Sequence, residues 1–172
     1  DSLKNQRSGI EFNQEYADLG FRSHICGTIT ANIKELVPRK QLRFMGDGSA
    51  YSYISMAESI EDADLSEEDL ASEKTGLIIG SGVASGAPLV EMADTLRNKG
   101  ARKVNPFYVP KIMSSCNAAN LATAFKIRGY SYTISSACAT SGHCLGNAYQ
   151  LIQAGEQDLI FIGGGDEVSW IV

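Results

Sequence analysis

The sequence has little of what several classes of protein require. Its 172 residues include one tryptophan and two histidines, and no apolar run approaches the roughly 18 residues of a membrane-spanning helix. Acidic residues outnumber basic ones by 20 to 15, so general attraction to nucleic acids or membranes is not expected. No signal peptide opens the chain. What remains is one ordinary globular domain, or a piece of a larger one.

Cysteine is also sparse, and its spacing excludes two kinds of site. Cys26, Cys116, Cys138 and Cys144 form no CxxC pair and no metal-binding pattern. They lie among apolar or small residues, which is typical of free thiols. We therefore expect a reducing, cytoplasmic setting, with no metal and no cofactor.

Both ends of the chain look like cuts through a longer protein. It begins at Asp1, without a methionine, in a polar turn, and it stops at Val172 in an apolar stretch. We expect residues 1–172 to form one half-domain that is truncated at both ends.

Short apolar stretches alternate with helical patterns along the chain. Strands are predicted at 24–31, 75–80, 130–135 and 158–163, and helices at 39–45, 47–63, 88–97, 111–125 and 140–154. Segment 64–74 is interpreted as an acidic, solvated surface turn, although Ser66-Glu67-Glu68-Asp69 resembles a helix start. The alternation predicts an α/β fold with a mixed, mostly parallel sheet and helices on its faces.

Two glycine-rich runs follow predicted strands. Gly80–Gly86 lacks the GxGxxG spacing and the Gly-Lys-Ser/Thr ending of phosphate-binding loops. Gly163–Gly165 is interpreted in the same way, as close packing and turn geometry. We expect tight loops near a substrate tunnel rather than nucleotide binding.

The most informative segment is 131–144, where a β-rich run ends in small residues, presents Cys138 and enters a helical pattern. A strand, a tight turn and a helix suit an exposed nucleophile. Small neighbours let a substrate carbonyl approach the backbone, and a helix N-terminus favours the thiolate. The alternative is a free buried thiol, and the segment's pattern alone leaves both open.

Neither histidine suits the role of general base for Cys138. His143 lies five residues later, which is a rotation of about 140° around a helix. We interpret it as a packed, hydrogen-bonded structural residue, and His24, on a predicted strand, in the same way. The chain therefore offers a nucleophile without a partner base.

Basic residues gather in two groups despite the net negative charge. The first group is Arg39, Lys40 and Arg43, and the second is Arg97, Lys99, Arg102 and Lys103. Each is either a solvated surface or a docking point for an acidic protein, through steering and pairing at the rim of an interface.

The segment Ile134–Ala148 closely resembles the active-site signature of β-ketoacyl-[acyl-carrier-protein] synthases, nearest to the synthase I branch of bacterial type II fatty acid synthesis. Further segments agree in order, at 7–10, 22–24, 39–45, 122–127 and 163–167. The resemblance implies the N-terminal half of a thiolase-like fold, an αβαβα sandwich of two similar halves. The opening strand of that half and everything after the glycine turn are absent from the sequence.

The resemblance implies a decarboxylative Claisen condensation in fatty acid biosynthesis. Cys138 would take an acyl chain from acyl carrier protein as a thioester, and its backbone N–H would be one oxyanion-hole donor. Malonyl-carrier protein would then lose carbon dioxide, and the carbanion would attack that thioester. The two catalytic histidines, the second oxyanion donor and a lysine come from the second half, so we expect this chain alone to be inactive.

The resemblance also gives roles to weaker sites. Met113, Tyr132 and Ile134 are implied at the acyl pocket and the interface of a homodimer, and both basic groups at the surface that meets acyl- or malonyl-loaded carrier protein. No nucleic acid or membrane partner is expected. Two alternatives stay open: a non-catalytic fragment that only binds carrier protein or dimerises, and a thiolase or polyketide ketosynthase relative.

Overall fold

The structure, a computed structural model, describes residues 1–171 and has a small parallel sheet at its centre. Its strands are β3 (Thr75–Gly80), β4 (Ser131–Tyr132) and β5 (Leu159–Gly164), in the order β4-β3-β5. Both neighbours run parallel to β3, which is buried along its whole length. Such burial is typical of a parallel strand with both faces covered. The predicted α/β fold is confirmed, although this sheet is parallel rather than mixed.

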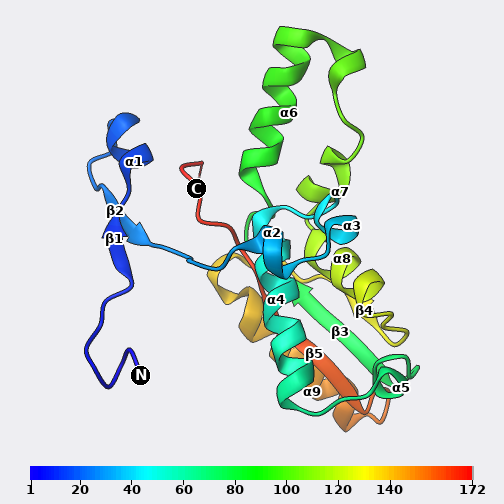
Figure 1. Cartoon of the computed structure of the whole chain (residues 1–172). Coiled ribbons are helices and arrows are strands. Elements are labelled where there is room, and N and C mark those ends of the chain that lie inside the picture. Colours follow the sequence, from blue (N-terminus) through cyan, green and yellow to red (C-terminus); the bar gives the residue numbers. More distant parts are fainter. Residues whose placement is uncertain (172) are drawn as a thin grey trace.

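Helices make up most of the remaining regular structure. In chain order they are α1 (Gln14–Asp18), α2 (Ile33–Leu36), α3 (Arg39–Leu42), α4 (Asp47–Asp62), α5 (Glu67–Leu70), α6 (Gly86–Lys99), α7 (Tyr108–Ile112), α8 (Cys116–Ala124) and α9 (Thr140–Gln153), with short 3-10 turns η1 (Ala101–Lys103) and η2 (Ala137–Ala139). Strands β1 (Ile10–Phe12) and β2 (Ile25–Gly27) form an antiparallel pair that stands apart from the body (Figure 1). Within residues 1–171 no helix has the length and apolarity to cross a membrane.

Alternate residues of β3 contribute to two separate cores, because side chains along a strand point to opposite faces. Leu77 and Ile79 pack against α4 and α8 on one face of the sheet. Ile78 packs on the other face against Cys144 and Ala148 of α9. Helices therefore cover both faces of the sheet, as predicted (Figure 1).

The helix predicted at 111–125 is wrong, because the chain forms two helices there. Pro110 lies in the first turn of α7, where its missing N–H is not needed. The backbone then becomes extended at Met113, with ψ of 140°, and α8 begins at Cys116. The three-residue break at 113–115 separates the directions of the two helices, and α8 packs on the sheet.

The strand predicted at 130–135 is also too long. Only Ser131 and Tyr132 pair with β3. Beyond them, side chains replace the sheet as hydrogen-bond partners: the Ser135 hydroxyl donates to the Ser81 carbonyl at 2.9 Å, and the Ser136 N–H donates to Thr140 Oγ1 at 3.0 Å. The chain thus leaves the sheet early and enters the turn before α9. The strand predicted at 24–31 likewise shortens to β2.

Segment 64–74 is more ordered than the predicted surface turn. The Ser66 hydroxyl accepts from the Asp69 N–H at 3.2 Å, and the Asp69 carboxylate accepts from the Ser66 N–H at 2.8 Å. This reciprocal cap starts α5, whose last residue, Leu70, is buried. The segment is largely exposed, as predicted, but the helix start noted at Ser66 is real, because the cap and one apolar anchor suffice for a short helix.

The predicted bounds of the longer elements agree with the structure to within a few residues. The helices predicted at 47–63 and 140–154 are α4 and α9, and the strands predicted at 75–80 and 158–163 are β3 and β5. The helix predicted at 88–97 extends in α6 to Gly86–Lys99, whereas that predicted at 39–45 ends at Leu42 in α3.

Candidate functional site

Cys138 lies in the tight turn that joins the sheet to α9. Residues Ala137–Ala139 form η2, and α9 begins at Thr140 directly after it. The Cys138 side chain is exposed. The N-cap residue of α9 is Ala139, whose side chain has no acceptor for the N–H groups of the first helical turn. The expected arrangement of a strand, a turn, an accessible sulfur and a helix start is therefore present.

The turn around Cys138 is strained and held by side chains. Ala137 has a φ of 49°, a left-handed conformation that costs a non-glycine residue about 1–3 kcal/mol. Thr140 Oγ1 closes the turn by donating to the Ala137 carbonyl at 2.7 Å while it accepts from the Ser136 N–H. A further hydrogen bond joins Ser136 Oγ to His143 Nδ1 at 2.7 Å.

The backbone N–H of Cys138 stands next to its own sulfur. Ala139 and Thr140 donate their N–H groups to the carbonyls of Ser136 and Ala137, but within residues 1–171 the Cys138 N–H makes no hydrogen bond. A backbone donor without a partner, beside an exposed sulfur, is available to a carbonyl oxygen bound at that sulfur.

A hollow of about 280 Å³ opens beside Cys138. The turn of Ala137 and Cys138 forms one wall. The others come from the loop after β3 and the segment after β5, through Gly82, Val83, Ala84, Asp166 and Glu167. The sulfur therefore borders a space large enough for part of a small substrate.

Two carboxylates after the glycine run hold the walls of this hollow. Asp166 Oδ1 accepts from the Ser81 hydroxyl at 2.5 Å and from the Gly82 N–H at 3.0 Å. Glu167 Oε1 accepts from the Ala87 N–H at 2.9 Å, in the first turn of α6. Because carboxylates already occupy these N–H groups, the loop is unsuited to a phosphate. Both residues lie in segment 163–167, which was singled out from the sequence, but no role was predicted for either of them.

A buried amide joins the strand ends that carry these loops. Asn117, which is 1% exposed, donates through Nδ2 to the carbonyls of Gly80 at 3.2 Å and Gly165 at 2.8 Å. Its Oδ1 accepts from the Ser49 hydroxyl of α4 at 2.6 Å. Asn117 therefore fixes β3, β5 and α4 relative to one another. The sequence pattern holds no signal for this role.

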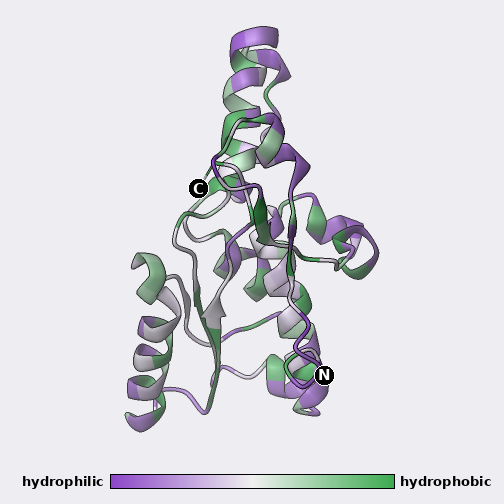
Figure 2. Ribbon diagram, turned by 90° about the vertical axis from the view of Figure 1, so that its left-hand side faces the viewer, coloured by the Kyte–Doolittle hydropathy of each residue, from purple (hydrophilic) through white to green (hydrophobic). Residues whose placement is uncertain are grey.

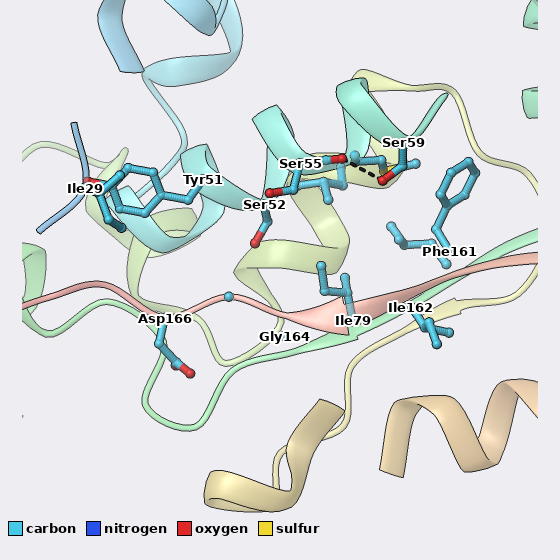
Figure 3. A pocket seen from close by; sticks show the side chains of 15 residues that line it. Ile29, Tyr51, Ser52, Ser55, Ser59, Ile79, Phe161, Ile162, Gly164 and Asp166 are labelled. Carbon is cyan, nitrogen blue, oxygen red and sulfur yellow. Dashed lines mark hydrogen bonds between the residues drawn. The ribbon is translucent and has the colours of Figure 1, made fainter. Parts of the chain in front are cut away.

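A second hollow, of about 310 Å³, lies between α4 and the sheet (Figure 3). Ser52, Ser55 and Ser59 line its α4 side, opposite Ile79 and Phe161. Cys138 does not border it. The hollow thus offers apolar and hydroxyl surface but no nucleophilic thiol.

The other thiols differ from Cys138 in exposure. Cys116 and Cys144 are 1% and 0% exposed, and burial raises the pKa of each thiol. Cys26 is half-buried. The cysteines are free, as the sequence predicts; of Cys26, Cys116 and Cys144, for which a buried thiol is the expectation, the last two are buried and Cys26 is not fully so. Within residues 1–171 no cluster of His, Cys, Asp and Glu is placed to hold a metal ion.

The two histidines are hydrogen-bonded or stacked but not packed inside. His143 is exposed, so the prediction of a packed residue is wrong, while its predicted hydrogen bond is present. His24 is also exposed and stands edge-on to Phe12, with ring centroids 6.0 Å apart. The physical reason is local: His143 points toward the preceding turn, and His24 lies on the hairpin that stands apart from the body.

The residues implied at the acyl pocket do not gather around Cys138. Met113 is half-buried at the break between α7 and α8. Tyr132 is 36% exposed on β4, an edge strand, and Ile134 packs against the core beneath α9. None of the three lines the hollow at Cys138. Their roles stay predictions.

The basic groups occupy two separate, exposed places. Arg39 and Lys40 lie on α3 and Arg43 directly after it, with the Arg43 guanidinium 4.1 Å from the centre of the Phe107 ring. The second group, at the end of α6 and in η1, lies at the tip of an arm that projects from the body (Figure 1). Figure 2 shows that this tip is hydrophilic. The two groups are thus not one continuous patch.

Comparison with solved structures defines the class of fold. A β-ketoacyl synthase from Burkholderia phymatum superposes with a TM-score of 0.85 at 24% identity, covering 98% of this chain and 42% of that one. A type II polyketide acyl-carrier protein complexed with its ketosynthase gives 0.71 at 12% identity, covering 82% and 41%. The chain therefore has the fold of the thiolase-like ketosynthases.

Sequence comparison is more specific. The family description "Beta-ketoacyl synthase, N-terminal domain" matches residues 1–170. The 3-oxoacyl-[acyl-carrier-protein] synthase 1 of Haemophilus influenzae is 48% identical over 170 residues, which are 98% of this chain and 42% of that protein. This chain belongs to the β-ketoacyl synthase family, and it spans less than half the length of the curated relatives it matches.

Proposed function

We propose that this chain is the N-terminal, acyl-accepting half of a 3-oxoacyl-[acyl-carrier-protein] synthase, and that the whole protein elongates fatty acyl chains. The observation that carries the proposal is the exposed Cys138 sulfur beside its own backbone N–H, which has no hydrogen-bond partner within residues 1–171, at the start of α9. The 48% identity to a synthase of this activity supports the fatty acid branch over thiolases and polyketide synthases.

The first step is acyl transfer to Cys138. Its sulfur attacks the thioester carbonyl of an acylated carrier protein, a new S–C bond forms, and the bond to the donor sulfur breaks. The proton that Cys138 gives up ends on the departing thiol. As negative charge collects on the carbonyl oxygen, the Cys138 N–H donates a hydrogen bond to it.

The second step is condensation. Malonyl-carrier protein loses carbon dioxide, and the resulting carbanion attacks the thioester carbonyl on Cys138. A C–C bond forms, the Cys138 thiolate leaves, and the product is a 3-oxoacyl thioester. Because His143 bonds to Ser136 and His24 lies on the separate hairpin, we propose that the histidines for this step lie outside this chain.

The acyl chain and a second protomer complete the proposed site. We assign Met113, Tyr132 and Ile134 to the acyl pocket and the dimer interface, where burial contributes about 0.8 kcal/mol per methylene. β4 supports a homodimer because, among residues 1–171, it pairs only with β3 and leaves its outer edge open to a strand of another protomer.

Carrier protein docks, in this proposal, on the two basic groups. Arg39, Lys40 and Arg43 would meet one acidic surface and the projecting arm another. Their exposure supports steering of an acidic partner, and a ketosynthase of the same fold is known in complex with its carrier protein. All four cysteines lie within residues 1–171 and are free thiols there, which supports a reducing, cytoplasmic location.

The test is mass spectrometry of the full-length protein after incubation with acyl-carrier protein. We expect one acyl group, on Cys138, and none in the Cys138→Ala variant. The Cys26→Ala variant is the matched control and should be acylated like the wild type. Acylation at another thiol, or its persistence in Cys138→Ala, would show that the assignment is wrong.

One observation favours a second function, a non-catalytic carrier-protein-binding module: within residues 1–171 neither histidine bonds to Cys138. That function predicts binding of acyl-carrier protein with no acylated thiol in the same experiment.

A further inference from the structure

His143 is a polar group near the nucleophile that the proposed function does not use. Its Nδ1 lies 2.7 Å from Ser136 Oγ, and the imidazole is exposed rather than packed in a core. It lies in the first turn of α9, whereas Ser136 precedes the strained residue Ala137. The hydrogen bond therefore spans the turn that carries Cys138.

Ser136 is held at each of its hydrogen-bonding groups. Its N–H donates to Thr140 Oγ1 at 3.0 Å, its carbonyl accepts from the Ala139 N–H at 3.1 Å, and its hydroxyl bonds to His143. The first of these bonds reaches Thr140, the first residue of α9, and the second reaches Ala139, which belongs to the turn itself. In the described part of the chain, the bond to His143 is the one hydrogen bond that ties the Ser136 side chain to α9.

The strained backbone of Ala137 explains why a hydrogen bond between Ser136 and His143 would matter. A left-handed Ala137 persists only where surrounding contacts hold it, because an alanine gains by relaxing to a right-handed or extended conformation. Relaxation of Ala137 would rotate the peptide group between Ala137 and Cys138, whose N–H is the proposed oxyanion donor. It would also move the sulfur relative to the hollow.

We propose that His143 is a positioning residue, which acts through Ser136 to keep the sulfur and the backbone N–H of Cys138 oriented for acyl transfer. The inference rests on the proposed function of Cys138. We do not assign His143 the proton of Cys138, because its Nδ1 is engaged with Ser136 and, within residues 1–171, no hydrogen bond joins the ring to the sulfur.

The contacts of His143 also separate this role from a general structural one. The buried residues of α9 are Thr140, Cys144 and Ala148, and none of them depends on the imidazole. Asn147 bonds to the His143 carbonyl at 2.9 Å, which survives a change of side chain. Replacing His143 should therefore leave α9 and its core in place.

The experiment measures single-turnover acylation of Cys138 in the full-length protein by acyl-carrier protein over a range of donor concentrations. His143→Ala should lower the maximal rate about tenfold and leave the half-saturating concentration unchanged. His143→Asn keeps a polar group near the position of Nδ1 and should recover the rate to within about threefold of wild type. Gln150→Ala, at an exposed position of the same helix, should react as the wild type does.

A double-mutant cycle identifies the partner. Ser136→Ala should slow acylation by the same factor as His143→Ala, and the double variant should be no slower than either, since all three remove one bond. Multiplying effects would overturn the proposed pair. So would an unchanged rate in His143→Ala, or a loss in His143→Asn as large as in His143→Ala.

Failure of the proposed function has a different signature. If wild-type Cys138 takes no acyl group at all, the assignment of the nucleophile fails and the role of His143 falls with it. If wild type is acylated and the His143 variants are acylated equally fast, only the positioning role is wrong.

Discussion

The carboxylate of Asp166 holds the Ser81 hydroxyl at 2.5 Å, across 85 positions of sequence. Ser81 directly follows β3, and Asp166 lies two residues beyond the end of β5. The same Ser81 oxygen accepts from the Ala84 N–H at 2.7 Å. This pair therefore shapes the loop that faces Cys138 across the hollow, and it ties that loop to the adjacent strand end.

Removal of the Asp166 carboxylate should destabilise this loop. In Asp166→Ala the buried Ser81 hydroxyl and the Gly82 N–H lose their acceptor, which should lower the free energy of unfolding by about 1–3 kcal/mol. Asp166→Asn keeps one acceptor oxygen and should lose less. Urea unfolding of this chain measures both, with the exposed Asp158→Ala as control. Equal stability of Asp166→Ala and Asp158→Ala would contradict the role.

Two glycines should respond in opposite directions to alanine. Gly142 lies inside α9 with open space where a Cβ would be, so Gly142→Ala should stabilise the chain by about 0.5–1 kcal/mol. A Cβ on Gly165 would overlap Ser52 Oγ and approach the Gly48 carbonyl at 2.9 Å, so Gly165→Ala should cost about 1–3 kcal/mol. Thermal unfolding compares the two variants, and shifts of the same sign would refute the packing described.

The buried thiols should make stability depend on pH. Burial raises the folded-state pKa of Cys116 and Cys144 above the ordinary 9.0. Their contribution is fully present below 9.0, and it is lost as pH rises from there through the higher folded-state pKa, because the unfolded chain then releases protons that the folded chain keeps.

The free energy of unfolding should thus fall as pH rises above about 9, and less steeply in a Cys116→Ala, Cys144→Ala double variant. Urea titrations at several pH values measure the slopes. The variant will be less stable at every pH, since it leaves two small cavities. The comparison therefore uses the slope of the free energy of unfolding against pH, not its absolute value. Equal slopes would mean that these thiols do not contribute.

Local pattern predicted much of the fold correctly. β3 and β5 are short apolar runs bounded by glycine or polar residues, and α4 and α9 have helical periodicity over several turns. Prediction failed where the conformation of a single residue sets the end of an element, as at the extended Met113, where the predicted helix divides into two. In α9, periodicity predicts one apolar face of Leu145, Ala148, Leu151 and Ile152; Ala148 and Leu151 do pack with Ile78, but Leu145 and Ile152 are exposed.

The candidate site divides in the same way. Its nucleophile was predictable, since Cys138, its small neighbours and the helix after it are contiguous in the chain. The hollow beside it was not, because its walls come from segments that follow two different strands. Nor was the exposure of His143, which depends on the path of the turn and not on the helical pattern.

The amino-acid sequence by itself determined the order of strands and helices and the position of a sulfur at the start of α9. These depend on periodicity and on residues within one turn of each other. Only the tertiary structure decided that Asp166 meets Ser81 and that Asn117 joins Gly80 to Gly165. Such partners become neighbours only when parallel strands bring their ends together, and no local pattern encodes which distant donor will satisfy a buried acceptor.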